Sequence, residues 1–187
     1  MKPIYFVDTE TTGLSQIRHE IIEIAICDIE GRELLNRRVK PMHPERCNAA
    51  VRKINGFDEE AWKHLADWRF VAPEVLQIFD RKRCYMAGHN TQFDLGFILE
   101  ECRNKGFVVS TLPYKALDLY TLAVAKLAPR GHTRFRLADI CEALEVVNEA
   151  PHTALGDVRA TAACWRALME IDAYPDPREK DAFSDED

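Results

Sequence analysis

Short apolar runs alternate with longer segments of helical periodicity along most of this chain. The apolar runs predict strands, and the Asp28–Arg32 turn between the second and third predicts a hairpin. The first run, Ile-Tyr-Phe-Val, has no polar interruption, as in a buried central strand. The predicted strands lie at 4–8, 21–27, 33–40, 84–88 and 107–109.

The remaining segments space their apolar residues three and four apart, which predicts helices. The last helix carries the clearest stripe: Leu155, Val158, Ala162, Trp165 and Met169. The predicted helices lie at 70–82, 91–104, 119–127, 136–144 and 153–170. Strands that alternate with helices indicate an α/β fold, and the hairpin makes its sheet mixed.

A chain of 187 residues suits one domain, which we place at 1–171. Residues 172–187 are polar and acidic, and we expect a disordered tail there. No apolar run is long enough to span a membrane. The N-terminus reaches Asp8 too early for a secretory signal, so we expect a cytoplasmic protein. The six scattered cysteines form no Cys-x-x-Cys pair and are expected to be reduced thiols.

Most of the net charge of −6 comes from the tail. The tail contains seven acids and two bases, so residues 1–171 carry only −1. This balance permits a polyanionic partner without demanding one. Four basic side chains gather before the last helix and could hold phosphates, although a solvated loop is the commoner meaning of such a run. They are Arg130, His132, Arg134 and Arg136.

Two carboxylates at the end of the first strand are the first candidate chemistry. Asp8 and Glu10 are two residues apart and therefore point to the same face of the strand. Such a pair repels unless a cation lies between the two groups, and oxygen ligands suit Mg²⁺ or Mn²⁺. The alternative is a pair of solvent-facing acids on an edge strand, which the apolar approach to Asp8 disfavours.

Two further segments place acids at helix starts. Asp94 follows the strand-to-helix junction Gly88–Phe93, where ligands gather in α/β folds. Taken alone, Asp94 is explained by the helix dipole, and Asn90 by either an N-cap or a sugar contact. Asp157 lies early in the last helix and off its apolar stripe, with His152 just before the helix.

The three segments together resemble the three motifs of the DEDDh branch of the DnaQ-like 3′→5′ exonucleases, a family that includes polymerase III epsilon subunits, RNase T and oligoribonucleases. Asp-Thr-Glu-Thr-Thr-Gly-Leu at 8–14 matches the first motif, 90–94 the second and 152–157 the third. The resemblance covers about residues 4–169. It implies a ribonuclease H-like fold with a mixed five-stranded sheet flanked by helices.

The resemblance also implies the chemistry. Two divalent cations, Mg²⁺ or Mn²⁺, are expected about 4 Å apart. The catalytic residues would be Asp8, Glu10, Asp94, His152 and Asp157. The four acids among them would hold the metals, with Asp8 bridging, and His152 would act as general base. The expected product is a nucleoside 5′-monophosphate.

Residues beside the metals are expected to contact the substrate's 3′ end. Leu14 and Phe93 could stack on bases, although Phe93 suits core packing equally well. The full expected set is Thr11, Thr12, Gly13, Leu14, Asn90 and Phe93. Many epsilon-like members carry His-Gly-Ile where this chain has Asn55-Gly56-Phe57, so the resemblance transfers no 3′-end contact to that segment.

The function expected is hydrolysis of single-stranded 3′ ends, with DNA as the working substrate. The residues themselves do not choose between DNA and RNA, because that choice depends on contacts to the 2′-hydroxyl. Three alternatives stay open: a proofreading subunit that acts only with a DNA polymerase, an RNA-trimming exoribonuclease, and a non-catalytic nucleic-acid-binding domain. The last is disfavoured because all five catalytic residues are present.

Overall fold

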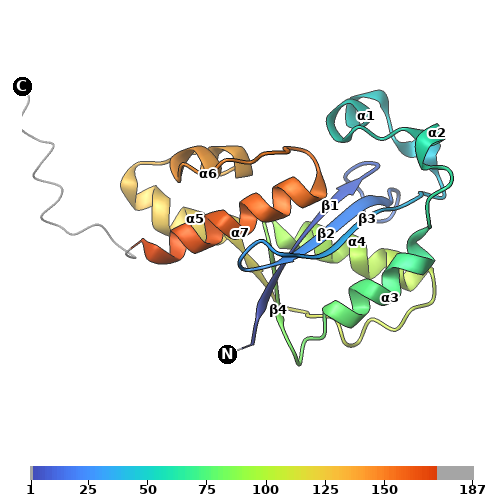
Figure 1. The fold of residues 1–187 in the computed structure, drawn as a ribbon, viewed down its shortest axis with the longest axis horizontal. Coiled ribbons are helices and arrows are strands. Elements are labelled where there is room, and N and C mark those ends of the chain that lie inside the picture. The colour runs from blue at the N-terminus through green and yellow to red at the C-terminus, as the bar shows by residue number, and fades with distance from the viewer. Residues whose placement is uncertain (1, 172–187) are drawn as a thin grey trace, which may run out of the picture.

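The computed structural model describes residues 2–171, so the predicted tail at 172–187 lies outside the described residues. Five strands form one sheet in the order β3-β2-β1-β4-β5. The strands are β1 (Ile4–Thr11), β2 (Ile21–Asp28), β3 (Glu33–Arg38), β4 (Tyr85–Gly88) and β5 (Ala116–Asp118). The sheet is mixed and flanked by helices, as the sequence predicts (Figure 1).

The central strand is β1, which pairs antiparallel with β2 and parallel with β4. The predicted hairpin is present, because β2 and β3 pair antiparallel. β1 continues to Thr11, three residues beyond the predicted end. Asp8 and Glu10 therefore lie on the strand itself, and cross-strand pairing to Ala25 and Glu23 fixes their positions.

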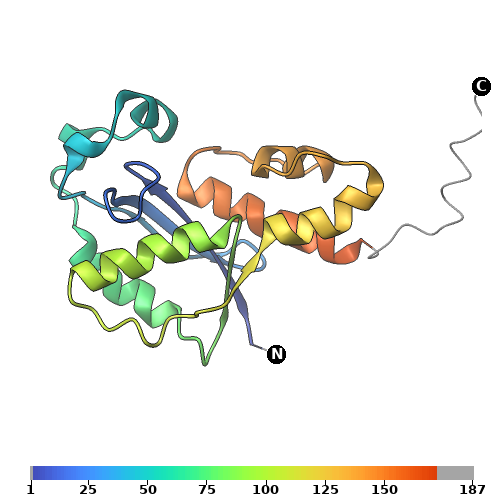
Figure 2. The same ribbon diagram turned by 180° about the vertical axis from the view of Figure 1, so that it is seen from behind.

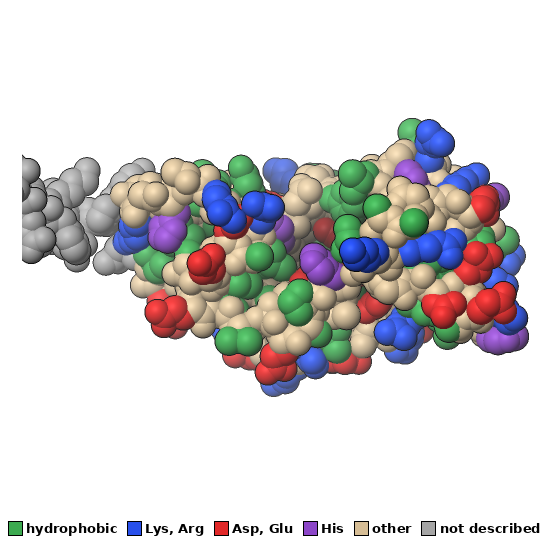
Figure 3. Space-filling view, turned by 90° about the horizontal axis from the view of Figure 1, so that it is seen from above, with side chains coloured by type: hydrophobic (Ala, Val, Ile, Leu, Met, Phe, Trp, Pro, Cys, Tyr) green, Lys and Arg blue, Asp and Glu red, His purple; other side chains and the backbone are tan. Residues whose placement is uncertain are grey.

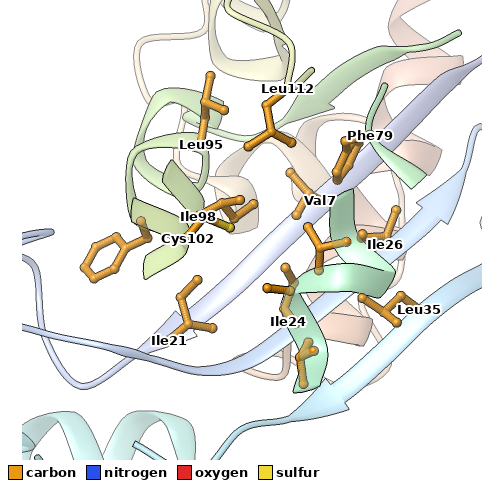
Figure 4. Packing of buried hydrophobic residues seen from close by; sticks show 14 of the residues in the cluster. Val7, Ile21, Ile24, Ile26, Leu35, Phe79, Leu95, Ile98, Cys102 and Leu112 are labelled. Carbon is orange, nitrogen blue, oxygen red and sulfur yellow. The ribbon is translucent and has the colours of Figure 1, made fainter. Parts of the chain in front are cut away.

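Helices cover both faces of the sheet (Figures 1 and 2). One face packs on α3 (Trp68–Ile78) and α4 (Thr91–Asn104), with Val7, Ile24 and Ile26 pointing into this core (Figure 4). The other face packs on three helices, of which α7 lies across β1 and β2. These helices are α5 (Leu119–Leu127), α6 (Leu137–Ala143) and α7 (Ala154–Glu170).

Two parts of the structure differ from the sequence-based expectations. The connection after β3 folds into two short helices, α1 (Ala49–Asn55) and α2 (Glu59–Trp62), which stand beyond the end of β1 in Figure 1. The fifth strand is Ala116–Asp118, and the expected strand at 107–109 is wrong. Phe107 and Val109 instead pack against the α3–α4 core, and this burial explains their alternating apolar pattern.

Two expectations about composition can be compared with the described residues. All six cysteines are buried and free, in agreement with the expected reduced thiols. Among residues 2–171, no helix combines the length and the apolar character that a membrane crossing requires.

One carboxylate joins the starts of two helices at the carboxyl end of the parallel strands. Asp118 Oδ2 accepts a hydrogen bond from the Thr91 backbone N–H at 2.8 Å, at the first residue of α4. Asp118 Oδ1 accepts from the Thr121 N–H at 3.0 Å and caps α5. The β4 and β5 ends are thereby locked together beside the residues that carry the second motif.

Replacing Asp118 with Ala should therefore remove two helix caps at once. Each cap contributes about 0.5–2 kcal/mol, so we expect a loss of about 1–4 kcal/mol in the free energy of unfolding. Asp67→Ala is the matched control, because Asp67 caps only α3, through the Arg69 N–H. Urea denaturation would measure both, and an equal loss in the two variants would refute the double role of Asp118.

Candidate active site

Three carboxylates converge where β1 meets the start of α7. Asp8 and Glu10 share a strand face with Phe6, which packs in the α5–α7 core. Asp157 extends from the first turn of α7 toward the same point. One carboxylate oxygen from each of these three residues lies within 4.8 Å of the others. The structure thus brings together three of the predicted metal ligands in a set of hard oxygen donors, and this set fits a divalent cation.

The fourth predicted ligand, Asp94, lies near this cluster on the other face of the sheet and is not among the three acids whose oxygens lie within 4.8 Å of one another. Asp94 is buried in the first turn of α4. Its Oδ1 accepts a hydrogen bond from the Thr9 hydroxyl at 2.7 Å. Thr9 lies between Asp8 and Glu10 on β1 and points to the opposite face. The charge of Asp94 acts on Asp8. β1 therefore positions acids on both faces of the sheet.

Burial and mutual repulsion dominate the electrostatics of these acids. Desolvation, followed by the charges of Asp94 and Asp157, raises the pKa of Asp8 well above its ordinary value. Burial raises the pKa of Glu10 to about 8, and Asp157 and Glu23 add to that shift. Burial also raises the pKa of Asp94 to about 7 against the opposing hydrogen bond from Thr9. Without a cation, the cluster holds protons near neutral pH; a divalent cation would replace them.

The segment before α7 holds Asp157 in place. Asn148 Nδ2 donates to Asp157 Oδ1 at 2.6 Å, and the His152 backbone N–H donates to Asp157 Oδ2 at 3.3 Å. His152 has a φ of 64°, in the left-handed region. Its side chain is exposed, so the imidazole stands at the border of the cluster and is not packed in the core. Asn148 is not among the predicted site residues, and its sequence context offers no signal for this role.

A fifth acid, Glu23, also belongs to this neighbourhood and was not predicted. It pairs with Glu10 across β1 and β2 and is 5% exposed. Its Oε1 accepts from the Ala154 backbone N–H at 3.2 Å, and its Oε2 lies 3.8 Å from Arg38 Nε. Glu23 thereby ties the start of α7 to the sheet. A charged residue inside the isoleucine-rich run 21–26 was the signal that could have revealed it.

The loop after β1 carries the first predicted substrate contacts. The Thr12 hydroxyl accepts from the Glu20 N–H at 3.0 Å, and the Thr11 hydroxyl donates to the Gly13 carbonyl at 2.7 Å. Both threonine side chains are buried and brace the loop. A Cβ on Gly13 would lie 2.5 Å from the His19 ring, so a larger residue there would require that ring to move. Leu14 is 84% exposed at the loop's tip and is free to meet a ligand.

The second motif places a different set of groups beside the acids. Asn90 has a φ of 60° and its exposed side chain forms no cap, because Asp118 supplies the acceptor for the first turn. The Asn90 amide is thus left for other contacts. Phe93 is half-buried against Phe97 and the α3–α4 core, so it packs and is also partly accessible. His89 lies in the same junction, and its Nδ1 is buried without a hydrogen-bond partner among the described residues.

The departure at Asn55-Gly56-Phe57 has a structural role. Asn55 is buried at the end of α1, and its Nδ2 donates to the Thr11 carbonyl at 3.1 Å. Its Oδ1 accepts from the Phe57 N–H at 3.2 Å. Asn55 therefore anchors the α1–α2 segment to the end of β1, next to the loop that carries Leu14.

The elements around the acids form a hollow rather than a closed cavity. Figure 3 looks onto the end of the molecule where β1 terminates, with the α5–α7 half on one side and the α1–α2 half on the other. The surface is hollowed between the two halves, and acidic side chains lie within the hollow (Figure 3). An extended polymer could therefore reach the carboxylates from outside.

Comparison with known proteins places these features in a family. The exonuclease model RNase_T matches residues 5–164. Over 166 residues, the chain is 28% identical to the 3′-5′ exonuclease DinG of Bacillus subtilis, covering 88% of this chain and 17% of DinG. It is 29% identical to a PolC-type DNA polymerase III of Caldanaerobacter subterraneus, covering 87% of this chain and 11% of the polymerase. The chain thus spans only a small part of these relatives.

A shorter relative and solved structures agree with that placement. The DNA polymerase III subunit epsilon of Treponema pallidum is 28% identical over 168 residues, with 87% of this chain and 74% of that subunit covered. E. coli exonuclease I in complex with a dA16 oligonucleotide superposes with a TM-score of 0.78 at 18% identity, covering 97% of this chain and 43% of that enzyme. This likeness confirms the ribonuclease H-like fold.

The raised pKa of Glu10 gives the metal-free protein a defined pH dependence. An unfolded glutamate titrates near 4.5 and folded Glu10 near 8, so the folded state binds more protons between these values. The stability contributed by protonated Glu10 is present below that window and is lost as pH rises through it. In EDTA, the melting temperature should therefore fall from about pH 5 to about pH 8.

Glu10→Gln should flatten this decline, because the amide has no proton to lose. Glu74→Gln is the control, since Glu74 is an exposed acid paired with Arg37 on the protein surface. Melting curves of the three proteins across the pH range would test the expectation. Parallel curves for the wild type and Glu10→Gln would contradict it.

Proposed function

The chain belongs to the DnaQ-like exonuclease family, as its three motifs predicted, and from that premise we propose that it is a metal-dependent 3′→5′ exonuclease. Its proposed substrate is a single-stranded nucleic acid end, with DNA first, and its product a nucleoside 5′-monophosphate. The observation that carries the proposal is the convergence of Asp8, Glu10 and Asp157 within 4.8 Å.

The residues that would hold divalent cations are Asp8, Glu10, Asp157 and Asp94, which supply only oxygen donors. Bound Mg²⁺ or Mn²⁺ would neutralise the phosphodiester, activate the attacking water and stabilise the leaving oxygen. Asp8 sits centrally, since Asp94, Asp157 and Glu10 all act on its pKa. This position suits the expected bridging ligand.

His152 is proposed to accept a proton from the attacking water. Its backbone N–H is fixed on Asp157, while its exposed ring is free to turn toward a substrate in the hollow. Imidazole is suited to this task because its ordinary pKa lies near neutrality. Asn148 and Glu23 would act as positioning residues, because they hold Asp157 and the start of α7 and are not placed to touch the reacting atoms.

The terminal nucleotide is proposed to lie against the loop that ends β1. Exposed Leu14 and half-buried Phe93 offer apolar surface to a base, and such contacts tolerate any sequence. Thr11, Thr12 and Gly13 fix the shape of the loop, and the uncapped Asn90 amide is available to a sugar hydroxyl. DNA is placed first because the relatives include DNA polymerases and because exonuclease I was solved with a DNA oligonucleotide.

A second candidate function is proofreading in association with a DNA polymerase. Two of the relatives, the PolC-type polymerase and the epsilon subunit, are components of DNA polymerase III. In that case the chemistry is unchanged, and the isolated chain would hydrolyse slowly until the polymerase is added.

Incubation with 5′-labelled single-stranded DNA and RNA, in Mg²⁺, Mn²⁺ or EDTA, tests the primary proposal. We expect a metal-dependent ladder that shortens from the 3′ end, faster on DNA. Asp8→Asn should abolish it, because the central ligand loses its charge. Asp28→Asn is the control, since Asp28 lies at the opposite end of the sheet, paired with Tyr5.

Each other outcome of that assay points elsewhere. Faster shortening of RNA would indicate an exoribonuclease, and activity that appears only with an added polymerase would indicate the proofreading role. Binding of labelled oligonucleotide without hydrolysis under any of these conditions would refute catalysis and favour a binding domain.

His152→Ala should lower kcat by about 10²–10⁴-fold if its role is proton transfer. His64→Ala is a matched control, because His64 is an exposed histidine outside the cluster. The pH profile of kcat would separate proton transfer from a merely structural role, since the variant should lose the acidic limb that the wild type shows. A near-full rate at neutral pH would remove His152 from the mechanism.

A further inference from the structure

A cavity of about 400 Å³ opens beside the carboxylate cluster and has no role in the function proposed so far. It lies at the carboxyl ends of β4 and β5, under the connection between α5 and α6. Its walls are formed by His89, Asn90, Asp118, Tyr120, Thr133, Phe135 and Arg136. His89 links it to the cluster: burial lowers the pKa of His89, and the nearby carboxylates of Asp118 and Asp157 oppose that shift.

Aromatic rings make up much of the cavity's surface. The Tyr120 ring stands edge-on to His89, with centroids 6.3 Å apart, and to Phe135, with centroids 6.1 Å apart. Tyr120 is 48% exposed, which is high for a ring held by two aromatic contacts. Rings presented in this way offer faces on which nucleobases stack whatever their identity.

Two exposed arginines stand at and beside the rim of the cavity. Arg134 and Arg136 both pair with a single acid, Asp139, and both arginine side chains stay largely exposed. Of the two arginines, Arg136 lines the cavity itself. Asp118, the acid in the wall, already accepts hydrogen bonds from Thr91 and Thr121. The exposed Arg136 guanidinium is therefore available to a phosphate, and part of the basic run noted in the sequence lies here.

The cavity and the proposed terminal-nucleotide site lie on opposite faces of the sheet. Phe93 packs with the α3–α4 core, whereas Phe135 packs with the α5–α7 core. The carboxylates of Asp8 and Glu10 stand near the end of β1 on the α5–α7 face, and Asp94 lies on the other face. A strand whose last nucleotide rests on Leu14 and Phe93 and whose preceding nucleotides enter the cavity would cross the carboxylates with its terminal phosphodiester.

We propose that this cavity is the subsite for the nucleotides on the 5′ side of the scissile phosphodiester. Tyr120 and Phe135 stack on a base there, and Arg136 holds a backbone phosphate. The inference rests on the proposed exonuclease function and adds to it the path of the uncleaved strand. It requires that the cavity contribute to the hydrolysis of polymers and be dispensable for the hydrolysis of a substrate with a single nucleotide.

Two substrates separate the subsite from the chemistry. The p-nitrophenyl ester of thymidine 5′-monophosphate presents one nucleotide and no upstream strand, whereas a 5′-labelled oligothymidylate presents both. Tyr120→Leu should lower kcat/KM on the oligonucleotide by about tenfold or more, from the loss of one stacked base. It should leave hydrolysis of the ester unchanged, and Tyr120→Phe should restore the oligonucleotide rate because it keeps the ring.

Arg136→Gln tests the phosphate contact by its salt dependence. The slope of log(kcat/KM) against log[salt] should become shallower by about 0.7 on the oligonucleotide, as for one lost contact to a single strand. Tyr85→Leu and Arg37→Gln are matched controls. Tyr85 is 43% exposed at the start of β4, at the end away from the carboxylates, and Arg37 on β3 pairs with Glu74 of α3.

The outcomes distinguish this inference from the proposed function. Equal losses on the ester and the oligonucleotide, or no loss on either, would overturn the subsite while leaving the exonuclease intact. If the wild type hydrolyses neither substrate, the exonuclease proposal fails. The subsite is then decided by fluorescence anisotropy of the labelled oligonucleotide in Ca²⁺, where Tyr120→Leu should still weaken binding and the control variants should not.

Discussion

The crowding of carboxylates around Asp8 is the constraint on which the rest of this structure depends. Burial raises the pKa values of Asp8, Glu10, Asp94 and Asp157, and repulsion among the acids adds to this shift for Asp8 and Glu10. Such an arrangement persists only if the surrounding fold is stable enough to impose it. The central strand, covered by two apolar cores, provides that stability, and a divalent cation is the natural way to relieve the repulsion.

The surrounding fold holds the acids close together through hydrogen-bond donors that face them. The Thr9 hydroxyl, the Asn148 amide and the His152 N–H each donate to a carboxylate of the cluster. Glu23 turns the start of α7 toward β1 by accepting from Ala154. Among residues 2–171, no hydrogen bond engages the carboxylate oxygens of Asp8 or Glu10. The site is therefore rigid in its backbone and still able to receive a cation, the combination that an exchangeable metal requires.

The five catalytic candidates were predicted because their three segments together resemble the motifs of the DnaQ-like exonucleases; taken alone, Asp94 is explained by the helix dipole. Asp8 and Glu10 share a strand face, Asp94 and Asp157 open helices, and His152 precedes one of them. The structure brings the acids together, while the roles of all five stay proposals. The central strand, the hairpin and the long helices were also predictable, because their apolar periodicities extend over many residues.

The rest depended on contacts between distant segments, which no local pattern contains. β5 has three residues, too few for a periodic signal, and it is a strand only because it pairs with β4. Asn148 looks like any loop residue until Asp157 is found beside it. The strand predicted at 107–109 is wrong because a segment packed on a helical core can also alternate buried and exposed residues. An apolar pattern indicates which residues are buried. A strand also requires backbone pairing with a neighbouring strand, which the pattern does not contain.

The contacts available to a substrate also explain why neither the sequence nor the fold chooses between DNA and RNA. The proposed base contacts, Leu14, Phe93 and Tyr120, are apolar or aromatic and accept any base. The proposed contacts of the carboxylates and of Arg136 are to phosphates, which DNA and RNA share. Only a group that reaches the 2′ position of the sugar can discriminate. Asn90 is the best-placed candidate, because its left-handed backbone turns an uncapped amide out at the start of α4, between the terminal-nucleotide surface and the aromatic cavity. Sugar preference therefore rests on very few atoms, and relatives with the same fold can differ in it without rebuilding the site.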